Sequence, residues 1–316
     1  MLNGQVPSAR PIHVLVTGAT GFLGRAAADA MLHAGHRVLR GARVAPPSPA
    51  SGQSWVAYGD IGPDTRWETA LAGIDTIVHL AGLAHRDDAA RTFDRINAQG
   101  TDRLASAAAR AGVRRLVLVS SALVHGDAGR GRPFTENDEP APVGPYARSK
   151  LDAERLLVAA GQGSGLEWVI LRPPMVYGAG ARGNFLRLAK LVRSGLPLPL
   201  GAATAPRTFI GVDNLADALV RCATHPDAAG RTFLVGDAET TSTADLVGRM
   251  AAILGRRARL LSVSPSLMRT TFRLAGRERD FHRLFDPLEL DTSLIRAVLG
   301  WSPLLSLDEG LRRAIC

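Results

Sequence analysis

Short apolar runs alternate with longer amphipathic stretches through the first 172 residues of the chain. The runs that predict strands are Ile12–Val16, Arg37–Leu39, Trp55–Tyr58, Thr76–Leu80, Leu116–Val119 and Trp168–Leu171. The stretches that predict helices are Phe22–His33, a short helix closed by Ala70–Gly73, about Ala89–Ala111, and Tyr146 to about Ala160. Strands that alternate with helices at this spacing predict a doubly wound α/β domain with a parallel sheet. Several strand runs are apolar throughout, as expected for strands that are buried on both faces.

The alternation changes after Arg172, where proline-rich connections separate the helical segments. The elements predicted there are helices near Phe185–Arg193, Asp213–Thr224, Thr243–Leu254, Pro265–Leu274 and Thr292–Leu299, and a strand at Thr232–Val235. We therefore predict one domain over residues 1–172, with elements near 207–235 returning to its sheet. Residues 173–316 are expected to form mainly a smaller α/β lobe.

Composition and charge narrow the possible partners. Apolar residues make up 46% of the 316 positions and charged residues 21%, which is typical of a soluble globular protein. The net charge of +9 raises the question of nucleic acid binding. The arginines are dispersed, however, and gather only in small groups such as Arg114-Arg115 and Arg256-Arg257. We therefore favour a preference for anionic small substrates and expect no nucleic acid partner.

Cysteine usage and the absence of long apolar runs bear on location. The two cysteines, Cys222 and Cys316, lie far apart, so we expect neither a disulfide framework nor a metal site. A reducing cytoplasm fits this usage. No apolar run approaches about 18 residues, and Met1–Pro11 lacks the pattern of a signal peptide. We expect a cytoplasmic protein with no membrane partner.

Three glycines lie directly between the first predicted strand and the first predicted helix. Gly18, Gly21 and Gly24 follow Thr17 at three-residue spacing. Glycine at such positions lets the backbone approach a pyrophosphate, and the helix N-terminus supplies a positive dipole. At this place in an alternating α/β pattern, the triplet predicts a dinucleotide-binding turn.

The end of the second strand normally determines which nicotinamide cofactor is bound, because an acid there bonds the adenosine 2′-hydroxyl. Here that position holds Arg40 and Arg43 and no acid. Arginine pairs with a 2′-phosphate, so we favour NADP over NAD. The alternative is that either arginine simply points to solvent. Asp60 and Ile61, which end the third strand, are placed to flank the adenine.

Tyr146 and Lys150 are four residues apart on a predicted helix and therefore lie on one face, one turn apart. A nearby ammonium favours the phenolate form of a tyrosine. The chain has only three tyrosines and two lysines, which makes the pairing informative. Arginine could not replace the lysine, because it does not give up its proton. The alternative is an ordinary helix start with a surface cation.

Taken together, these motifs resemble the extended short-chain dehydrogenase/reductases in their order along the chain. The stretches that carry the resemblance are Thr17–Gly24, Asp75–Gly82, Asn97, Ser120-Ser121, Tyr146 with Lys150, Arg172–Pro174, Arg207–Asp213 and Leu299–Pro303. The chain is most similar to the nucleotide-sugar epimerase/dehydratase branch, and to relatives of UDP-galactose 4-epimerase that make sugars for bacterial surface polysaccharides. The resemblance covers essentially the whole chain and implies a Rossmann-type domain with a C-terminal substrate lobe.

The resemblance implies roles for four residues around the reacting sugar oxygen. Tyr146 would be the acid/base, and Lys150 with an oxidised nicotinamide would lower its pKa. Ser121 would hydrogen-bond the same oxygen, and Asn97 would support the lysine. Asparagine on a helix could equally be a solvated surface residue.

The same resemblance implies a set of cofactor-binding residues at the strand ends. In addition to Gly18, Gly21, Gly24, Arg40, Arg43, Asp60, Ile61, Tyr146 and Lys150, they are Thr20, Phe22, Leu23, Leu80, Ala81, Gly82, Val119 and Pro173. The hydride itself is carried by the cofactor, whereas the protein supplies position and protons.

The chain departs from the family pattern at several positions. His125-Gly126 stands where the family has Tyr-Gly, and Ala84 stands where the 4-epimerase has a lysine. His85 is a candidate substrate contact, although a loop histidine is more often exposed to solvent. Ser121 is followed by Ala122-Leu123 rather than by the Asp-Glu pair of the sugar 4,6-dehydratases. Elimination then has no acid and base, so we exclude dehydration.

For the substrate, Arg207 matches an arginine that binds the nucleotide diphosphate, and Asn184 lies in a loop that meets the same group. Arg207 could instead cap a helix or pair with Asp213. We expect reversible hydride transfer at C4 of a UDP-sugar, by a 4-keto reductase or a 4-epimerase, with the reductase slightly favoured. A non-catalytic, NADP-binding redox-sensing regulator is the alternative from another class. The resemblance also implies a homodimer formed through the Tyr146 helix and its neighbour.

Overall fold

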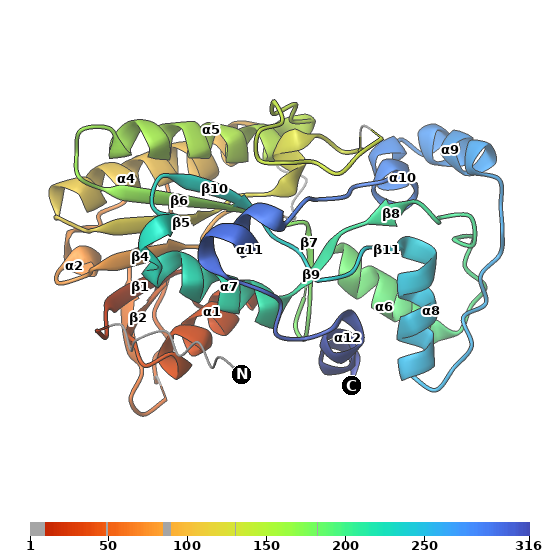
Figure 1. The fold of residues 1–316 in the computed structure, drawn as a ribbon, viewed down its shortest axis with the longest axis horizontal. Helices are drawn as coiled ribbons and strands as arrows, with labels where there is room; N and C mark the ends of the chain where they lie inside the picture. The colour runs from red at the N-terminus through yellow and green to blue at the C-terminus, as the bar shows by residue number, and fades with distance from the viewer. Residues whose placement is uncertain (1–9, 49, 85–89, 130, 182) are drawn as a thin grey trace.

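The computed structural model describes residues 10–316 apart from 49, 85–89, 130 and 182 (Figure 1). Its centre is a sheet of seven strands in the order β10–β6–β5–β4–β1–β2–β3, and all neighbouring pairs run parallel. The strands are β1 (His13–Thr17), β2 (Arg37–Ala42), β3 (Ser54–Ala57), β4 (Thr76–His79), β5 (Arg115–Val119), β6 (Glu167–Arg172) and β10 (Arg231–Leu234). The predicted doubly wound α/β sheet is confirmed.

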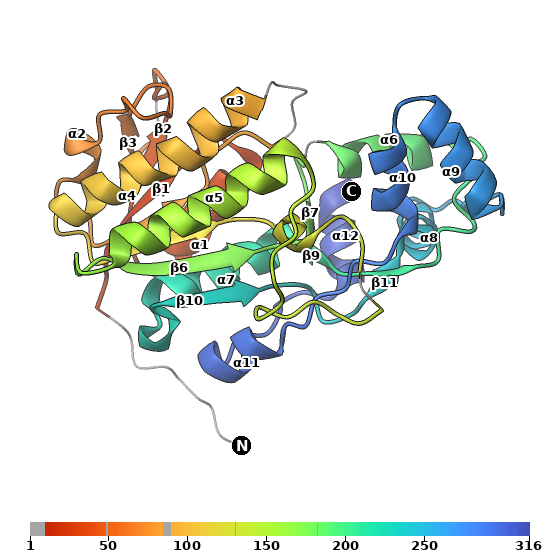
Figure 2. The same ribbon diagram turned by 90° about the horizontal axis from the view of Figure 1, so that it is seen from above.

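Helices cover both faces of this sheet, which explains why several of its strands are apolar along most of their length (Figures 1 and 2). Alanine, valine and leucine side chains of the helices pack against the two faces in separate buried clusters. One face is covered by α1 (Phe22–His33) and α7 (Val212–Thr224), the other by α4 (Gly100–Arg110) and α5 (Gly144–Gly161). The strand order reverses between β1 and β4, so the helices that follow these strands diverge and leave a crevice at their carboxyl ends.

The long helix predicted over Ala89–Ala111 is divided in the structure. A short helix, α3 (Ala90–Phe93), passes through a π-helical turn at Asp94–Gln99 into α4. Ala89 lies outside the described residues. A π-helical turn is rare and occurs frequently at functional sites, and here it determines the direction in which Asn97 points.

The C-terminal lobe has its own apolar core, built from helices and from short strands that the sequence reasoning missed in part. Its elements are β7 (Met175–Tyr177), α6 (Asn184–Ser194), β8 (Pro206–Arg207), β9 (Phe209–Gly211), β11 (Thr241–Ser242), α8 (Thr243–Ile253), α9 (Pro265–Leu274), α10 (Glu278–Phe285) and α12 (Leu307–Ile315). The helix α11 (Ser293–Leu299) instead packs against the core of the sheet domain. The helices α10 and α12 were not predicted. α12 does carry a sequence signal, because Ser306 and Glu309 form a capping box at its start.

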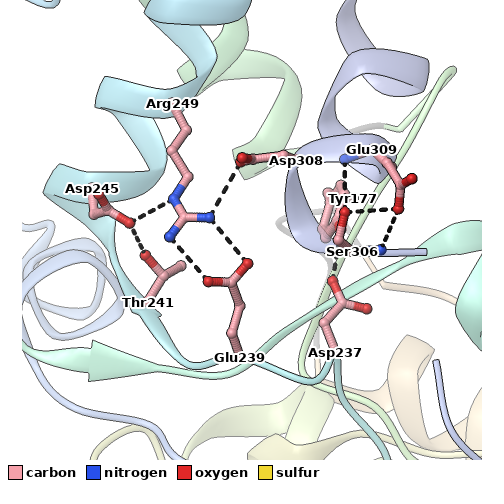
Figure 3. A network of polar contacts seen from close by, with 9 residues as sticks. All are labelled: Tyr177, Asp237, Glu239, Thr241, Asp245, Arg249, Ser306, Asp308 and Glu309. Carbon is pink, nitrogen blue, oxygen red and sulfur yellow. Dashed lines mark hydrogen bonds and ion pairs between the residues drawn. The ribbon is translucent and has the colours of Figure 1, made fainter. Parts of the chain in front are cut away.

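A buried tyrosine joins the lobe to the sheet domain (Figure 3). The Tyr177 hydroxyl donates to Asp237 at 2.6 Å, and Asp237 also accepts from Asn214 Nδ2 at 2.7 Å and from the Gly211 amide at 3.1 Å. These hydrogen bonds offset part of the cost of burying the Asp237 carboxylate, whose pKa is raised by burial. The strands β7 and β9, the helix α7 and the segment after β10 therefore meet at one point.

Close to this point, one arginine holds the outer part of the lobe together (Figure 3). Arg249 of α8 contacts Glu239 at 3.0 Å, Asp245 at 2.8 Å and Asp308 of α12 at 3.2 Å. The guanidinium is 29% exposed, so solvent weakens each pair, but three carboxylates share one rigid cation. The network fixes α12 beside α8.

The position of β10 bears on where the sheet domain ends along the chain. The strand β10 pairs with β6 at the edge of the main sheet, so a segment well beyond Arg172 belongs to that sheet. The division of the chain at residue 172 stays a prediction.

No helix in the described part of the chain combines the length and apolarity that are needed to cross a bilayer.

The packing around Tyr177 predicts opposite effects for two glycine substitutions in helices. A Cβ at Gly310 of α12 would lie 2.6 Å from the Tyr177 hydroxyl, which Asp237 holds in place. A Cβ at Gly248 of α8 would meet nothing within 4 Å. We expect Gly310→Ala to lower the free energy of unfolding by about 1–3 kcal/mol. Gly248→Ala should raise it by about 0.5–1 kcal/mol, because glycine is unfavourable inside a helix.

Urea unfolding of both variants measures this difference. Equal stabilisation by the two alanines would contradict the placement of Tyr177 against α12.

Candidate active site at the carboxyl ends of the strands

The turn between β1 and α1 has the geometry that a dinucleotide needs. Gly18 has a φ of +69°, and a Cβ on it would lie 3.0 Å from the Ala81 backbone. A Cβ at Gly24 would lie 2.0 Å from the Gly18 carbonyl oxygen, so α1 packs directly on the turn. No side chain caps the start of α1, which leaves its first amides available to an anion. These residues fit a bound pyrophosphate.

One hydroxyl links this turn to the turn after β4. Thr17 Oγ1 accepts the amides of Leu80 at 3.1 Å and Ala81 at 3.2 Å. With both lone pairs occupied, it donates its own proton to Nδ1 of His79, 2.8 Å away. The His79 proton is therefore on Nε2. Burial and the charge of Lys150 lower the pKa of His79 to about 3, so the ring is neutral.

The predicted cofactor-binding residues gather at this same edge of the sheet. Thr20, Phe22 and Leu23 form the turn and the start of α1, whereas Leu80, Ala81 and Gly82 follow β4. Val119 ends β5, and Pro173 follows β6, where its carbonyl accepts the Ala122 amide at 2.9 Å. Their contact with a cofactor stays a prediction.

The two arginines at the end of β2 differ in their freedom. Arg40 is 4% exposed; it pairs with Asp29 of α1 at 2.6 Å and lies over the Trp55 ring at 5.9 Å. The Arg43 side chain is 75% exposed, and its nearest acid is Asp60 at 3.5 Å. Arg43 is therefore the arginine of the pair that is accessible to a phosphate, whereas Arg40 serves to fasten α1.

Near the end of β2, where the adenosine is predicted to bind, lies a residue that the sequence reasoning did not single out. The Tyr58 hydroxyl accepts the Gly18 amide at 3.0 Å, and its ring passes so close to Gly41 that a Cβ there would lie 3.0 Å away. Beyond it, a hollow of about 500 Å³ is lined in part by Asp60, Ile61 and Arg95. Glycine at position 41, inside a strand, was the available signal, since it marks a close approach.

Tyr146 and Ser121 meet where α5 begins beside the end of β5. Burial raises the pKa of Tyr146, and the neighbouring Ser121 side chain lowers it by a smaller amount. The net pKa of Tyr146 lies above its usual value of 10, so the phenol is protonated at neutral pH. The Phe93 ring packs against it edge-on at 6.1 Å. The predicted pair of Ser121 and Tyr146 is thus brought together.

Lys150 lies one turn further along α5 and is 9% exposed. Burial lowers the pKa of its ammonium to about 8, and the negative charge of Glu154 opposes that shift. A lysine with this pKa is mostly charged at neutral pH but exchanges its proton readily. The surface-cation alternative is wrong, because the side chain is buried.

Asn97 holds the two sides of the site together. Its Nδ2 donates to the Leu83 carbonyl and to Ser149 Oγ, both at 3.0 Å, and its Oδ1 accepts the Leu83 amide at 2.8 Å. The residue is 3% exposed, so it is not a solvated surface residue. Ser149 precedes Lys150, which means that Asn97 connects the turn after β4 with the lysine-bearing part of α5.

A buried network of Glu154, Arg172 and His125 lies behind Lys150. Arg172 binds Glu154 through two hydrogen bonds of 3.1 and 2.6 Å, and its third nitrogen lies 3.0 Å from His125 Nε2. The His125 ring stacks on Phe134 at 5.2 Å. His125, which stands where the family has a tyrosine, is 1% exposed and therefore serves the network.

Arg207, which was predicted to bind the substrate diphosphate or to cap a helix, does cap a helix. Arg207 is 6% exposed and donates to the carbonyls of Asp286 and His282, so it caps the end of α10. It does not pair with Asp213, which contacts Arg313 at 3.4 Å. Burial, together with the charge of Arg283, lowers the pKa of Arg207 to about 10.

Arg283 of α10 was missed by the sequence reasoning. Its charge acts on both Tyr146 and Arg207, and its Nε is buried without a hydrogen-bond partner among the described residues. No motif marks it, because its position depends on how α10 folds back toward the start of α5. Asn184 begins α6, but its side chain is not described, and His85 lies outside the described residues.

In the described part of the chain, no group of three or more histidine, cysteine or acidic side chains could hold a metal ion.

A family model described as the NAD dependent epimerase/dehydratase family matches residues 14–236. The chain belongs to this family.

Relatives of known identity extend the match over nearly the whole chain. The UDP-glucose 4-epimerase of Vibrio cholerae is 34% identical over 310 residues, which cover 96% of this chain and 94% of that protein. The dTDP-6-deoxy-L-talose 4-dehydrogenase (NAD(P)(+)) of Kitasatospora kifunensis is 31% identical over 318 residues, with 97% and 95% covered. The structure of MoeE5 with UDP-glucuronic acid and NAD is 30% identical, has a TM-score of 0.78 and covers 96% and 97%. The predicted resemblance to nucleotide-sugar enzymes of the extended short-chain type is confirmed.

The neutral state of His79 predicts a pH-dependent stability. An unfolded histidine takes up a proton below pH 6.5, whereas folded His79 does so only near pH 3. Its contribution is therefore complete above pH 6.5 and is lost as the pH falls from 6.5 toward 3. About 2 kcal/mol of this contribution should disappear between pH 7.5 and 5.

Urea unfolding of the wild type and of His79→Gln at both pH values tests this claim. Glutamine can still accept the Thr17 proton but does not titrate, so the variant should lose about 2 kcal/mol less than the wild type over this interval. An identical loss in the two proteins would show that His79 is not buried neutral.

Proposed function

We propose that the protein catalyses NAD(P)-dependent oxidoreduction at C4 of a nucleotide sugar, with a UDP-sugar favoured. The observation that carries the proposal is the placement of Ser121 beside Tyr146, with the buried Lys150 one turn away on α5 and the glycine turn on the same sheet edge. The kinship with the V. cholerae UDP-glucose 4-epimerase and with MoeE5, which was solved with UDP-glucuronic acid and NAD, supports this substrate class.

In the proposed reaction, Tyr146 exchanges a proton with the C4 oxygen of the sugar, and Ser121 hydrogen-bonds the same oxygen. When bound, the nicotinamide supplies or accepts the hydride. Lys150, with its pKa near 8, can return a proton to the phenol at neutral pH. Asn97 and Ser149 hold the lysine-bearing turn at the correct distance from the turn after β4.

Two features favour a 4-keto reductase over a 4-epimerase. Ala84 stands where the 4-epimerase has a lysine, and the exposed Arg43 at the end of β2 suits a cofactor that carries a 2′-phosphate. In the reductive direction, a protonated Tyr146 would donate to the keto oxygen. Dehydration is disfavoured because the turn after Ser121 begins with Ala122 and Leu123, which supply no acid or base.

Two guanidinium groups support an anionic substrate. Arg207 and Arg283 lie on the lobe side of Tyr146, and the charge of Arg283 acts on both Arg207 and Tyr146. Neither arginine forms an ion pair among the described residues, and two such cations attract a diphosphate. We therefore propose that Arg283 binds the diphosphate of the nucleotide sugar. Arg207 would assist through the guanidinium nitrogens that do not donate to the end of α10. Asn184 and His85 stay predictions.

The non-catalytic regulator is the weaker alternative. A protein that only binds NADP has no need of a buried lysine held by Glu154, Arg172 and Asn97. The expected homodimer through α4 and α5 and the cytoplasmic location remain proposals. Both helices lie on one outer face of the sheet domain (Figure 2).

For the cofactor, we propose that NADP is preferred and that Arg43 is the residue responsible. Arg43 is exposed and has a single long ion pair with Asp60, whereas the guanidinium of Arg40 is engaged by Asp29. The relative from K. kifunensis carries NAD(P)(+) in its name, and MoeE5 was solved with NAD.

The activity is tested with purified protein, UDP-4-keto-6-deoxysugars, UDP-sugars and reduced nicotinamide, followed by absorbance and by product analysis. A reductase consumes one reduced cofactor for each keto-sugar. We expect Tyr146→Phe to lower kcat by about 10²-fold or more and Lys150→Met to lower it by at least about tenfold. Lys190→Met, which changes the only other lysine, should leave kcat unchanged because Lys190 lies exposed on α6.

Two results of that assay would contradict parts of the proposal. Interconversion of epimers without net change in cofactor would identify an epimerase. Full turnover by Tyr146→Phe would remove the proton-transfer role.

The cofactor proposal predicts a selective loss of affinity. Arg43→Ala should weaken NADPH binding by about 10- to 100-fold, since a charge-assisted bond to the 2′-phosphate is lost. NADH binding should change by less than about threefold, because that cofactor lacks the 2′-phosphate. Fluorescence titration gives both dissociation constants, and Arg37→Ala, at the other end of β2, is the matched control. Equal losses for the two cofactors would rule out a 2′-phosphate contact.

A further inference from the structure

A stretch of the C-terminal lobe concentrates positive charge without any acid. Residues 256–277, which we call the basic segment, contain six arginines and no aspartate or glutamate. They are Arg256, Arg257, Arg259, Arg269, Arg273 and Arg277. The segment thus contributes +6, whereas the whole chain has a net charge of +9. All six arginines are exposed, so their charge faces the solvent.

The basic segment occupies one end of the molecule. From the end of α8 it runs along the extremity of the longest axis to α9, which lies at the corner above α10 (Figure 1). The view from above places α9 at the same extremity (Figure 2). A flat surface could therefore approach this end without meeting the sheet domain first.

The helix α9 is attached to the lobe by a narrow face. Met268 and Phe272, four residues apart, are its partly buried apolar side chains, and the Phe272 ring lies 6.3 Å from that of Phe281. No residue of α9 is fully buried. The rest of the helix surface is therefore available to another partner.

The outward part of α9 carries two exposed leucines. Leu267 is 59% exposed and Leu274 is 83% exposed. Seven residues apart, they share one face, which is turned about 130° from the face of Met268 and Phe272. Arg269 and Arg273 lie on the other side of the outward direction. The solvent-facing half of α9 is thus amphipathic, with apolar and cationic sides.

A second apolar projection continues this surface. Leu261 is 52% exposed and Leu196 is 61% exposed, and the segments that carry them are joined by backbone hydrogen bonds of 2.8 Å through Leu198. Arg257 and Arg259, both exposed, precede Leu261. Exposed leucines and exposed arginines therefore occur both on α9 and on the segment before it.

The acids nearest to the basic segment neutralise only part of it. Arg269 pairs with Glu278 at 3.3 Å, and Arg277 pairs with Asp280 at 2.7 Å. These pairs are at the start of α10, on the inner side of α9. The other four arginines of the segment form no ion pair among the described residues, so their charge is available to an anionic partner.

We propose that the basic segment is a peripheral membrane surface, which binds the headgroups of an anionic lipid bilayer through its arginines and inserts Leu267 and Leu274 at the interface. An amphipathic helix rich in arginine and leucine is the structure that binds in this way, and anionic lipid attracts each cation near its surface. This proposal departs from the sequence-based expectation of no membrane partner, which rested on the lack of spanning and targeting segments. The inference is independent of the proposed activity.

Other partners fit these features less well. A second copy of the chain would meet its own six arginines in a two-fold contact, because such an interface uses the same surface on both subunits. A protein partner usually seats its anchors in well-packed pockets, but α9 is convex and its leucines project singly. A bilayer requires no shape complementarity.

The test is flotation of the full chain with vesicles of phosphatidylcholine alone or with about 30% phosphatidylglycerol. We expect binding only to the anionic vesicles, and its loss as salt is raised from about 0.05 to 0.5 M, where screening is strong. The triple variant Arg257→Gln, Arg259→Gln, Arg273→Gln should reduce partitioning by roughly 10- to 100-fold. Leu267→Ser with Leu274→Ser should reduce it by at least about fivefold.

A matched control separates a defined surface from net charge. Arg37→Gln, Arg110→Gln and Arg312→Gln remove the same three charges from exposed positions elsewhere and should change partitioning by less than about twofold. Equal losses in the two triple variants would overturn the proposal in favour of diffuse charge. So would a failure to bind anionic vesicles, or self-association that the leucine variant abolishes in the absence of lipid.

Discussion

The burial of the Lys150 ammonium beside the sheet constrains the residues around it. A buried charge is costly unless other groups compensate for it. Glu154, one turn further on, supplies the opposite charge, and Arg172 in turn neutralises Glu154 through two hydrogen bonds. On the other side, His79 must remain neutral, and the proton that Thr17 donates to its Nδ1 favours that state. The lysine thus connects the phosphate turn to the interior of the sheet.

A π-helical turn packs against the helix that carries Lys150. A regular helix through Asp94–Gln99 would direct Asn97 differently, whereas here its amide reaches both Leu83 and Ser149. The turn after β4 and the middle of α5 are consequently held at a fixed separation. Tyr146 and Lys150 are on α5, and the predicted nicotinamide contacts follow β4 and β5. Small errors in this separation would misplace the proton donor relative to the reacting carbon.

Sequence reasoning predicted the sheet well because most of its strands contain a short apolar run between turn residues, and such runs have few alternatives. It predicted the turn of Gly18, Gly21 and Gly24 and the pair of Tyr146 and Lys150 from spacing alone. It missed α12, although Ser306 and Glu309 announce its start. It also missed Arg283, and it gave Arg40 a role that Asp29 largely prevents. Both depend on which segments fold beside each other, and local pattern contains no such information.

In the proposed function, the sheet domain binds the cofactor and the C-terminal lobe holds the nucleotide sugar. The two parts are joined where Tyr177 meets Asp237. The arginines that matter here are concentrated in the lobe. The arginines at the site lie on the lobe side of Tyr146, and the largest excess of arginine lies further out on α9 and the segment before it. An anionic substrate and an anionic surface would therefore be attracted to the same lobe.

The central claim is that Tyr146 donates a proton to the sugar oxygen while hydride reaches C4. The most direct measurement is the transfer of deuterium from nicotinamide labelled at C4 to a UDP-4-keto-sugar, followed by mass and NMR analysis of the product. The account predicts one deuterium at sugar C4 in the wild type, with transfer slowed by about 10²-fold or more in Tyr146→Phe. Transfer at an undiminished rate in that variant, or deuterium at any other sugar carbon, would contradict it.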